Sequence, residues 1–118
     1  MKKLDHERRR QKRFVKRCTI DFTSEGQNYR GICRNLSLDG LFIKTRKPLE
    51  LEKIIDMVLY LPDGSASKLT GRVRRAIREP YSLIFERAGI PSKDGIGVQL
   101  IEKDSNYLKF LESLMNRL

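Results

Sequence analysis

The feature that most constrains the fold is a series of short segments in which apolar side chains alternate or run together between turn-forming residues. The first segment, FVKRCTIDF at residues 14–22, places Phe14, Cys18, Ile20 and Phe22 on one face and polar side chains on the other. Alternation with a period of two is typical of a half-buried β-strand. Five further segments follow at short spacing, so the sequence predicts a domain built from six strands.

The first two strands are expected to form a hairpin. The intervening TSEGQN contains Gly26, which can supply the positive φ that a tight hairpin turn often requires. A turn centred on Gly26 and the residue before it places Phe22 opposite Tyr29 and Cys18 opposite Cys33. The two cysteines have no metal-ligand spacing and form no disulfide framework, so we interpret them as small buried apolar residues rather than as a redox pair.

The remaining strands and one long connection follow from the same pattern. The strands are expected at residues 29–34, 41–44, 54–61, 68–77 and 95–101. Residues 78–94 contain prolines and have a mixed pattern. They are expected to form a long connection or an extension of the fifth strand.

After residue 103 the apolar period changes from two to that of a helix. Asp104 is placed to cap the first turn, which predicts a C-terminal amphipathic helix over residues 104–118. Its apolar positions are Tyr107, Leu108, Leu111, Leu114, Met115 and Leu118. The sequence therefore predicts an all-β fold with a flanking helix, namely a six-stranded antiparallel β-barrel (residues 14–101) followed by this helix. A length of 118 residues is enough for one such domain.

The charge is strongly positive and unevenly distributed. The chain carries a net charge of +10, and nine of its 25 basic residues lie within residues 1–17, beside only two acidic ones. Residues 1–13 are therefore expected to form a flexible basic arm, which points to an anionic partner. The longest apolar run, at residues 54–61, is too short to cross a bilayer, and no secretory signal is present, so a cytoplasmic location is expected.

The residues that carry most enzyme chemistry are scattered or absent. The single histidine, His6, lies in the arm, and the carboxylates are interspersed singly among basic residues. There is no glycine-rich phosphate loop and no nucleophile with an accompanying base. The sequence thus predicts a binding protein rather than an enzyme, with no metal and no cofactor.

The arm contains the first binding motif. Arg9 and Arg13 are four residues apart, and Arg8 and Arg10 widen the cationic surface; Arg8 with Lys12 is the alternative pairing. Guanidinium groups can bind phosphate, stack on a purine or donate to guanine N7 and O6. Considered alone, the arm is better explained as a solvated basic tail or a nonspecific nucleic-acid contact than as a specific site.

The second motif is NLSLDG, residues 35–40, which we call the NLSLDG turn. As an ordinary turn, Ser37 would cap a backbone N–H and Gly40 would take a positive φ. As a binding site, the amide oxygen of Asn35 could accept from guanine N1–H and N2–H, and the Ser37 hydroxyl could bind base or phosphate. Gly40 would then let the backbone approach the ligand.

The two motifs in this order resemble the PilZ domain family. Its pattern is R-x-x-x-R before the first strand and, after a hairpin, D/N-x-S-x-x-G; Arg9, Arg13, Asn35, Ser37 and Gly40 match it. GIGVQL near the C-terminus is similar to the family's last strand, and the likeness covers nearly the whole chain.

This resemblance implies a stand-alone receptor for cyclic di-GMP, a bacterial second messenger with two guanines and two phosphates. It implies that the arginine pair binds phosphate and guanine, and that the NLSLDG turn binds a guanine from the barrel surface. Asn35 occupies a position where many members have Asp, and its neutral amide should weaken that contact. The family acts through effector proteins on processes such as motility and biofilm formation.

Two other functions fit the same pattern. The first is a nucleic-acid-binding barrel, which is disfavoured because the chain has no Trp and because Phe14, Phe22 and Tyr29 face the expected core. The second is a PilZ-like interaction module that binds no nucleotide.

Overall fold

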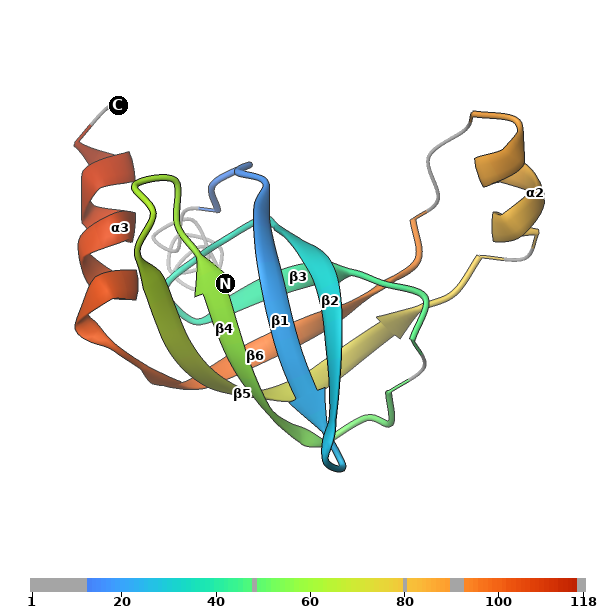
Figure 1. The fold of residues 1–118 in the computed structure, drawn as a ribbon, viewed down its shortest axis with the longest axis horizontal. Coiled ribbons are helices and arrows are strands. Elements are labelled where there is room, and N and C mark those ends of the chain that lie inside the picture. The colour runs from blue at the N-terminus through green and yellow to red at the C-terminus, as the bar shows by residue number, and fades with distance from the viewer. Residues whose placement is uncertain (1–12, 48, 80, 90–92, 117–118) are drawn as a thin grey trace, which may run out of the picture.

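The described residues form a closed antiparallel barrel of six strands with a helix at its side (Figure 1). The computed structural model describes residues 13–47, 49–79, 81–89 and 93–116. Around the barrel the strands follow the order β1-β2-β3-β6-β5-β4. The predicted fold class is therefore confirmed. The elements are β1 Cys18–Ser24, β2 Gln27–Arg34, β3 Gly40–Lys44, β4 Ile54–Tyr60, β5 Ala66–Ile77, α2 Ser82–Arg87, β6 Gly95–Lys103 and α3 Ser105–Met115.

The first hairpin has the predicted register. Phe22 pairs with Tyr29 and Cys18 with Cys33. The turn uses a φ of 78° at Gly26 and a positive φ at the residue before it, the combination that fits the right-handed twist of two antiparallel strands. Both cysteines are free and buried, and burial raises the pKa of both thiols. Their interpretation as buried apolar residues is confirmed.

The chain enters the barrel later than predicted. β1 begins at Cys18 rather than at Phe14. Phe14 instead pairs with Leu36: its N–H donates to the Leu36 carbonyl at 2.7 Å, and the Leu36 N–H donates back at 2.9 Å. The end of the arm is therefore fastened to the NLSLDG turn rather than to the side of β2.

α3 begins at a cap that also joins it to β5. Asp104 Oδ1 accepts from the Tyr107 N–H at 3.0 Å, as predicted for a helix N-cap. The same carboxylate accepts from the Ser67 hydroxyl at 2.6 Å and from the Lys68 N–H at 2.8 Å. One side chain thus begins the helix and holds it against the barrel.

Only part of the apolar stripe of α3 is buried. Tyr107, Leu111 and Leu114 belong to the same core as the strands. Leu108 and Met115 are 43% and 56% exposed, so these two positions of the predicted stripe lie outside the core. Leu118 lies outside the described residues. The buried positions follow a spacing of four and three residues, which is a single row along a helix.

A short helix, α2, interrupts the connection between β5 and β6, where a loop or strand extension was predicted. It stands away from the barrel, on the side opposite α3 (Figure 1). The two chain segments that lead to it are joined at their base. Asp94 accepts from the Glu79 N–H, and Glu79 accepts from the Lys93 N–H. None of the helices in the described residues has the length and apolar character needed to span a membrane.

Candidate functional site

The NLSLDG turn is closed by its own serine. The Ser37 hydroxyl accepts from the Gly40 N–H at 3.1 Å and donates to the Gly40 carbonyl at 3.0 Å. Asn35 has a φ of 53°, in the left-handed region that asparagine tolerates better than most residues. The expectation that Ser37 caps a backbone N–H is confirmed.

The glycine of the turn is required for a different reason from the one predicted. Gly40 is not among the described glycines with positive φ, so that prediction is wrong. A Cβ at Gly40 would lie 2.9 Å from the carbonyl oxygen of Val98 on β6. Gly40 therefore allows β3 and β6 to pair closely where the turn joins β3.

Two side chains from the C-terminal part of the chain donate hydrogen bonds to backbone carbonyls of the turn. The Tyr107 hydroxyl donates to the Ser37 carbonyl at 2.6 Å, and this contact is buried. Lys103 Nζ donates to the Leu38 carbonyl at 2.8 Å. Burial raises the pKa of Tyr107, so its hydroxyl keeps the proton that it donates. The sequence pattern identified Tyr107 only as an apolar helix position and gave no sign of this second role.

The arm and the turn meet at one described residue. Arg13 Nη1 donates to the Asn35 carbonyl at 3.3 Å, next to the backbone pairing of Phe14 with Leu36. The structure therefore brings together Arg13, Asn35, Ser37 and Gly40 of the predicted site. The other predicted arm residues, which are Arg8, Arg9 and Arg10, lie outside the described residues, as does Lys12 of the alternative pairing.

A pocket of about 770 Å³ lies beside the NLSLDG turn. Arg13, Asn35, Ser37 and Gly40 all line it. The described residues of its wall include six basic side chains and two acidic ones. An excess of positive charge around a concave surface attracts anions. The basic residues are Arg13, Arg34, Lys44, Arg74, Arg75 and Lys93, and the acidic residues are Asp39 and Asp94.

A β-bulge contributes two of these basic residues. The register of β5 against β6 shifts between Val73 and Arg75, so Arg74 and Arg75 are both exposed although they are consecutive. Strict alternation would turn only one of them outward, which is why the sequence pattern could not place both at the pocket. Arg34, next to Asn35, also lines the pocket, and no described residue accepts from its buried Nε–H.

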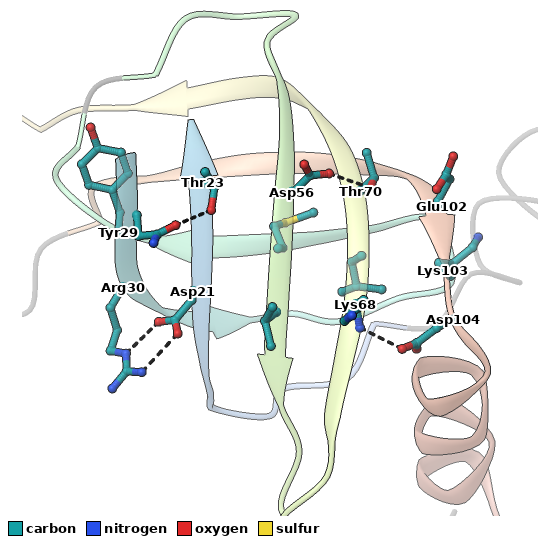
Figure 2. Close-up of a pocket in the computed structure, with 14 residues that line it drawn as sticks. Asp21, Thr23, Tyr29, Arg30, Asp56, Lys68, Thr70, Glu102, Lys103 and Asp104 are labelled. Atoms are coloured by element: carbon teal, nitrogen blue, oxygen red, sulfur yellow. Dashed lines mark hydrogen bonds and ion pairs between the residues drawn. The ribbon is translucent and has the colours of Figure 1, made fainter. Parts of the chain in front are cut away.

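A second hollow, of about 760 Å³, lies on another face of the barrel (Figure 2). Its described wall carries four carboxylates and three basic side chains, so it lacks the positive excess of the first pocket. Eight of its residues are also already joined in pairs (Figure 2). The pairs are Arg30 with Asp21, Thr23 with Asn28, Thr70 with Asp56, and the Lys68 N–H with Asp104. An anionic ligand is therefore better matched to the pocket beside the NLSLDG turn.

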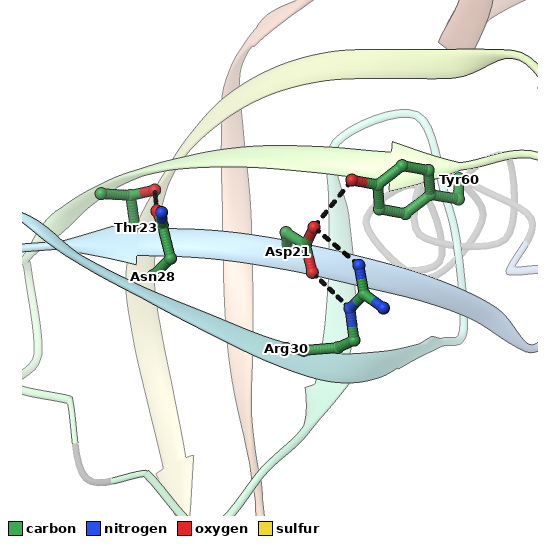
Figure 3. A network of polar contacts seen from close by, with 5 residues as sticks. All are labelled: Asp21, Thr23, Asn28, Arg30 and Tyr60. Atoms are coloured by element: carbon green, nitrogen blue, oxygen red, sulfur yellow. Dashed lines mark hydrogen bonds and ion pairs between the residues drawn. The ribbon is translucent and has the colours of Figure 1, made fainter.

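Asp21 is at the centre of a polar network that joins three strands (Figure 3). It accepts from Arg30 Nε at 2.7 Å and Nη2 at 3.1 Å, and from the Tyr60 hydroxyl at 2.7 Å. The hydrogen bond from Arg30 is the main cause that lowers the pKa of Asp21 to about 2. The carboxylate thus stays ionised and links β1 to β2 and β4.

The fold and the pocket together define a class: a small antiparallel β-barrel with a terminal helix and a cationic pocket beside a polar turn. The sequence profile of the PilZ domain matches residues 7–117. This chain belongs to the PilZ domain family, as the two motifs predicted.

Among solved structures, the inhibitor of motility of Bacillus subtilis, MotI/DgrA, has a similar fold. The TM-score is 0.70 at 15% sequence identity, and the likeness covers 91% of this chain and 49% of that one. The chain thus spans about half the length of this structural relative, and the likeness shows the shared fold. No curated protein sequence matches the chain.

Proposed function

We propose that this chain is a receptor for cyclic di-GMP, which it binds between the arm and the NLSLDG turn. The observation that carries the proposal is the contact of Arg13 with Asn35 at the edge of a pocket lined by six basic side chains. A cyclic dinucleotide offers two phosphates for the guanidinium groups and two guanines for the turn. Membership of the PilZ family supports this choice of ligand over other dianions.

Some of the motif residues would contact the ligand, and the others would maintain the shape of the turn. Arg9 and Arg13 would bind phosphate and guanine, with Arg8 and Arg10 adding positive charge. The Asn35 amide would accept from a guanine, in the role that the resemblance gives it. Arg34 and Arg75 in the pocket wall would attract the dianion before it docks, whereas Arg74 is already paired with Glu52.

Ser37 and Gly40 would act first through the shape of the turn. The Ser37 hydroxyl donates to the Gly40 carbonyl and accepts from the Gly40 N–H, which leaves it one acceptor lone pair for a ligand. The Gly40 backbone lies beside β6 and fixes where the turn ends. Their replacement would thus change the ligand site by moving Asn35.

Ligand binding would act on a partner protein through the arm. The basic residues of the arm repel one another, and a dianion would relieve that repulsion and give the arginines fixed partners. The ordered arm would change the surface offered to an effector in the cytoplasm, so the chain would serve as a single-domain adaptor without catalysis. Because the structural relative is an inhibitor of motility, swimming is the first output that we would measure.

Isothermal titration calorimetry with three ligands tests the proposal. We expect binding of cyclic di-GMP at micromolar concentration or below, and no heat with GTP or single-stranded DNA. Binding of DNA alone, with a steep dependence on salt, would instead indicate a nucleic-acid-binding barrel. If no ligand binds, the chain is a PilZ-fold interaction module without a nucleotide.

A further inference from the structure

The connection between β5 and β6 carries a group of large apolar side chains in contact with solvent. Tyr81, Leu83 and Ile84 are 71%, 57% and 61% exposed. We call these three residues the apolar tip. They fall within four consecutive positions, at the start of α2. Scattered exposed apolar residues are normal, but a contiguous group commonly marks a contact surface.

The fold holds the apolar tip away from the barrel. α2 projects from the barrel on the side opposite α3 (Figure 1). The mutual hydrogen bonds of Glu79 with Asp94 and Lys93 join the two segments at the base, and Asp94 is buried there. The tip is therefore presented on a fixed support and contributes nothing to the core.

Basic side chains flank the apolar tip. Arg78 and Arg87 are exposed and lie within three residues of the tip in the sequence, and Glu86 is the one acidic residue between Tyr81 and Arg87. Lys93 is exposed at the base, where it also lines the pocket, and the Glu79 and Asp94 carboxylates accept hydrogen bonds there. The chain as a whole has a net charge of +10, which opposes contact with a second copy of itself. Apolar side chains with basic neighbours match an anionic lipid surface, where the former enter the headgroup region and the latter approach phosphates.

We propose that the apolar tip and its basic neighbours dock this protein on anionic lipid membranes. A stable protein interface needs about 800 Å² from each partner, which an isolated six-residue helix does not offer. A lipid surface is fluid, so binding to it requires neither this area nor a complementary shape. The contact should be weak and reversible, with a partition coefficient of at most about 10⁴ M⁻¹, as for a single acyl chain. The proposal does not rest on cyclic di-GMP binding, although Lys93 also lines the pocket proposed for the nucleotide.

Vesicle sedimentation provides the first test. We expect the full chain to bind vesicles of equal parts phosphatidylcholine and phosphatidylglycerol. Its affinity for vesicles of phosphatidylcholine alone should be lower by a factor of at least about ten. The double variant Leu83→Asp with Ile84→Asp should lose binding. The matched variant Leu108→Asp with Met115→Asp, altered on the exposed edge of α3, should keep it. Retention of binding by the α2 variant would overturn the proposal, because the arm would then suffice. If the unaltered chain does not bind the mixed vesicles, the membrane proposal is also wrong, and a protein partner becomes the alternative for the apolar tip.

A fluorescence experiment shows whether the tip enters the lipid. The chain has no tryptophan, so a Leu83→Trp variant carries a single reporter, and Leu108→Trp is its control. With mixed vesicles, the emission of Leu83→Trp should shift to shorter wavelength and be quenched by brominated lipid, while Leu108→Trp should not change. Binding without a shift at position 83 would contradict insertion. Equal shifts in both variants would show that docking does not use α2.

Discussion

At the residue scale, the described residues of the two motifs, Arg13, Asn35, Ser37 and Gly40, have different roles. Ser37 and Gly40 maintain the fold. Ser37 makes two hydrogen bonds within the turn, and Gly40 leaves room for the Val98 carbonyl, which a side chain would contact too closely. Arg13 and Asn35 line the pocket and are joined to each other only through the Asn35 backbone carbonyl. The sequence pattern gives all of these residues the same weight, and only their contacts separate support from ligand binding.

Arg13→Ala should weaken cyclic di-GMP binding by roughly 1.5–3 kcal/mol, which is the usual contribution of a hydrogen bond to a charged group. This corresponds to about a tenfold to 150-fold higher Kd. Calorimetry measures the change. Lys68→Ala removes the same charge beside the other hollow and should leave Kd almost unchanged. Similar losses in both variants would show that the ligand senses overall charge rather than a site.

Gly40→Ala should lower the free energy of unfolding by roughly 1–3 kcal/mol, because the added Cβ would press on the backbone carbonyl of Val98 at 2.9 Å. Urea denaturation measures the loss. Gly97→Ala is the control, since its Cβ would meet the side chain of Arg75 at 3.3 Å and should cost less. An equal or smaller loss at Gly40 would contradict the packing explanation for this glycine.

At the scale of elements, α3 is joined to the NLSLDG turn although the two are far apart in the sequence. Asp104 holds its first turn to β5, and Tyr107 connects it to the NLSLDG turn. A helix that merely covered the barrel would need apolar contacts alone. The two polar contacts fix the height and rotation of α3 relative to the turn, so movement of one requires adjustment of the other.

Tyr107→Phe should cost about 1–3 kcal/mol of unfolding free energy, because it leaves the buried Ser37 carbonyl without its 2.6 Å partner. Tyr60→Phe removes a hydroxyl that donates to Asp21 on the surface, and its cost should be smaller. Urea denaturation of both variants provides the comparison. If Tyr60→Phe lowers the free energy of unfolding by as much as Tyr107→Phe, burial does not make the Tyr107 hydrogen bond more stabilising than an exposed one.

The first hairpin could be predicted from the sequence, whereas α2 and the bulge in β5 could not. The period-two segments and Gly26 were enough for the first hairpin and its register, because a two-residue turn fixes which side chains face each other. α2 is only six residues long, too short for a helical period to be recognised. The bulge before Arg75 could not be read either, since it breaks the alternation on which strand predictions rest.

At the scale of the whole molecule, the fold followed from local patterns, whereas the pocket depended on how the barrel closes. The pairing of β3 with β6 brings Gly97 beside Phe42 and Gln99 beside Gly40, although these residues are far apart in the sequence. No local signal reports such a meeting. The family motif located the turn, but Arg34, Arg74 and Arg75 became visible as pocket residues only in three dimensions.

The stability of the barrel should depend on pH at both ends of the scale. The pKa of Asp21 is about 2 in the folded state and near 3.8 when unfolded. Between these values the unfolded chain binds more protons, so stability should fall as the pH drops through this window. Burial raises the pKa of Cys18, Cys33 and Tyr107, so stability should also fall once the pH rises above about 8.5, where unfolded thiols ionise.

Urea midpoints across the pH range test this expectation. Asp21→Asn removes the titrating group and should make the acid limb shallower without altering the alkaline one. An unchanged acid limb would show that other carboxylates dominate. Asp104 is one such group, since hydrogen bonds from Ser67, Lys68 and Tyr107 outweigh its burial and lower its pKa.

The pairing of Phe14 with Leu36 has a consequence for how tightly any arm can hold its ligand. The pairing holds Arg13 beside the turn, and four residues of extended chain span at most about 14 Å, so this length limits how far Arg9 can lie from Arg13. A ligand seated on the turn therefore meets the arginines at an effective concentration in the millimolar range. The same arginines on a separate peptide would have to be supplied at about that concentration to replace the attached arm.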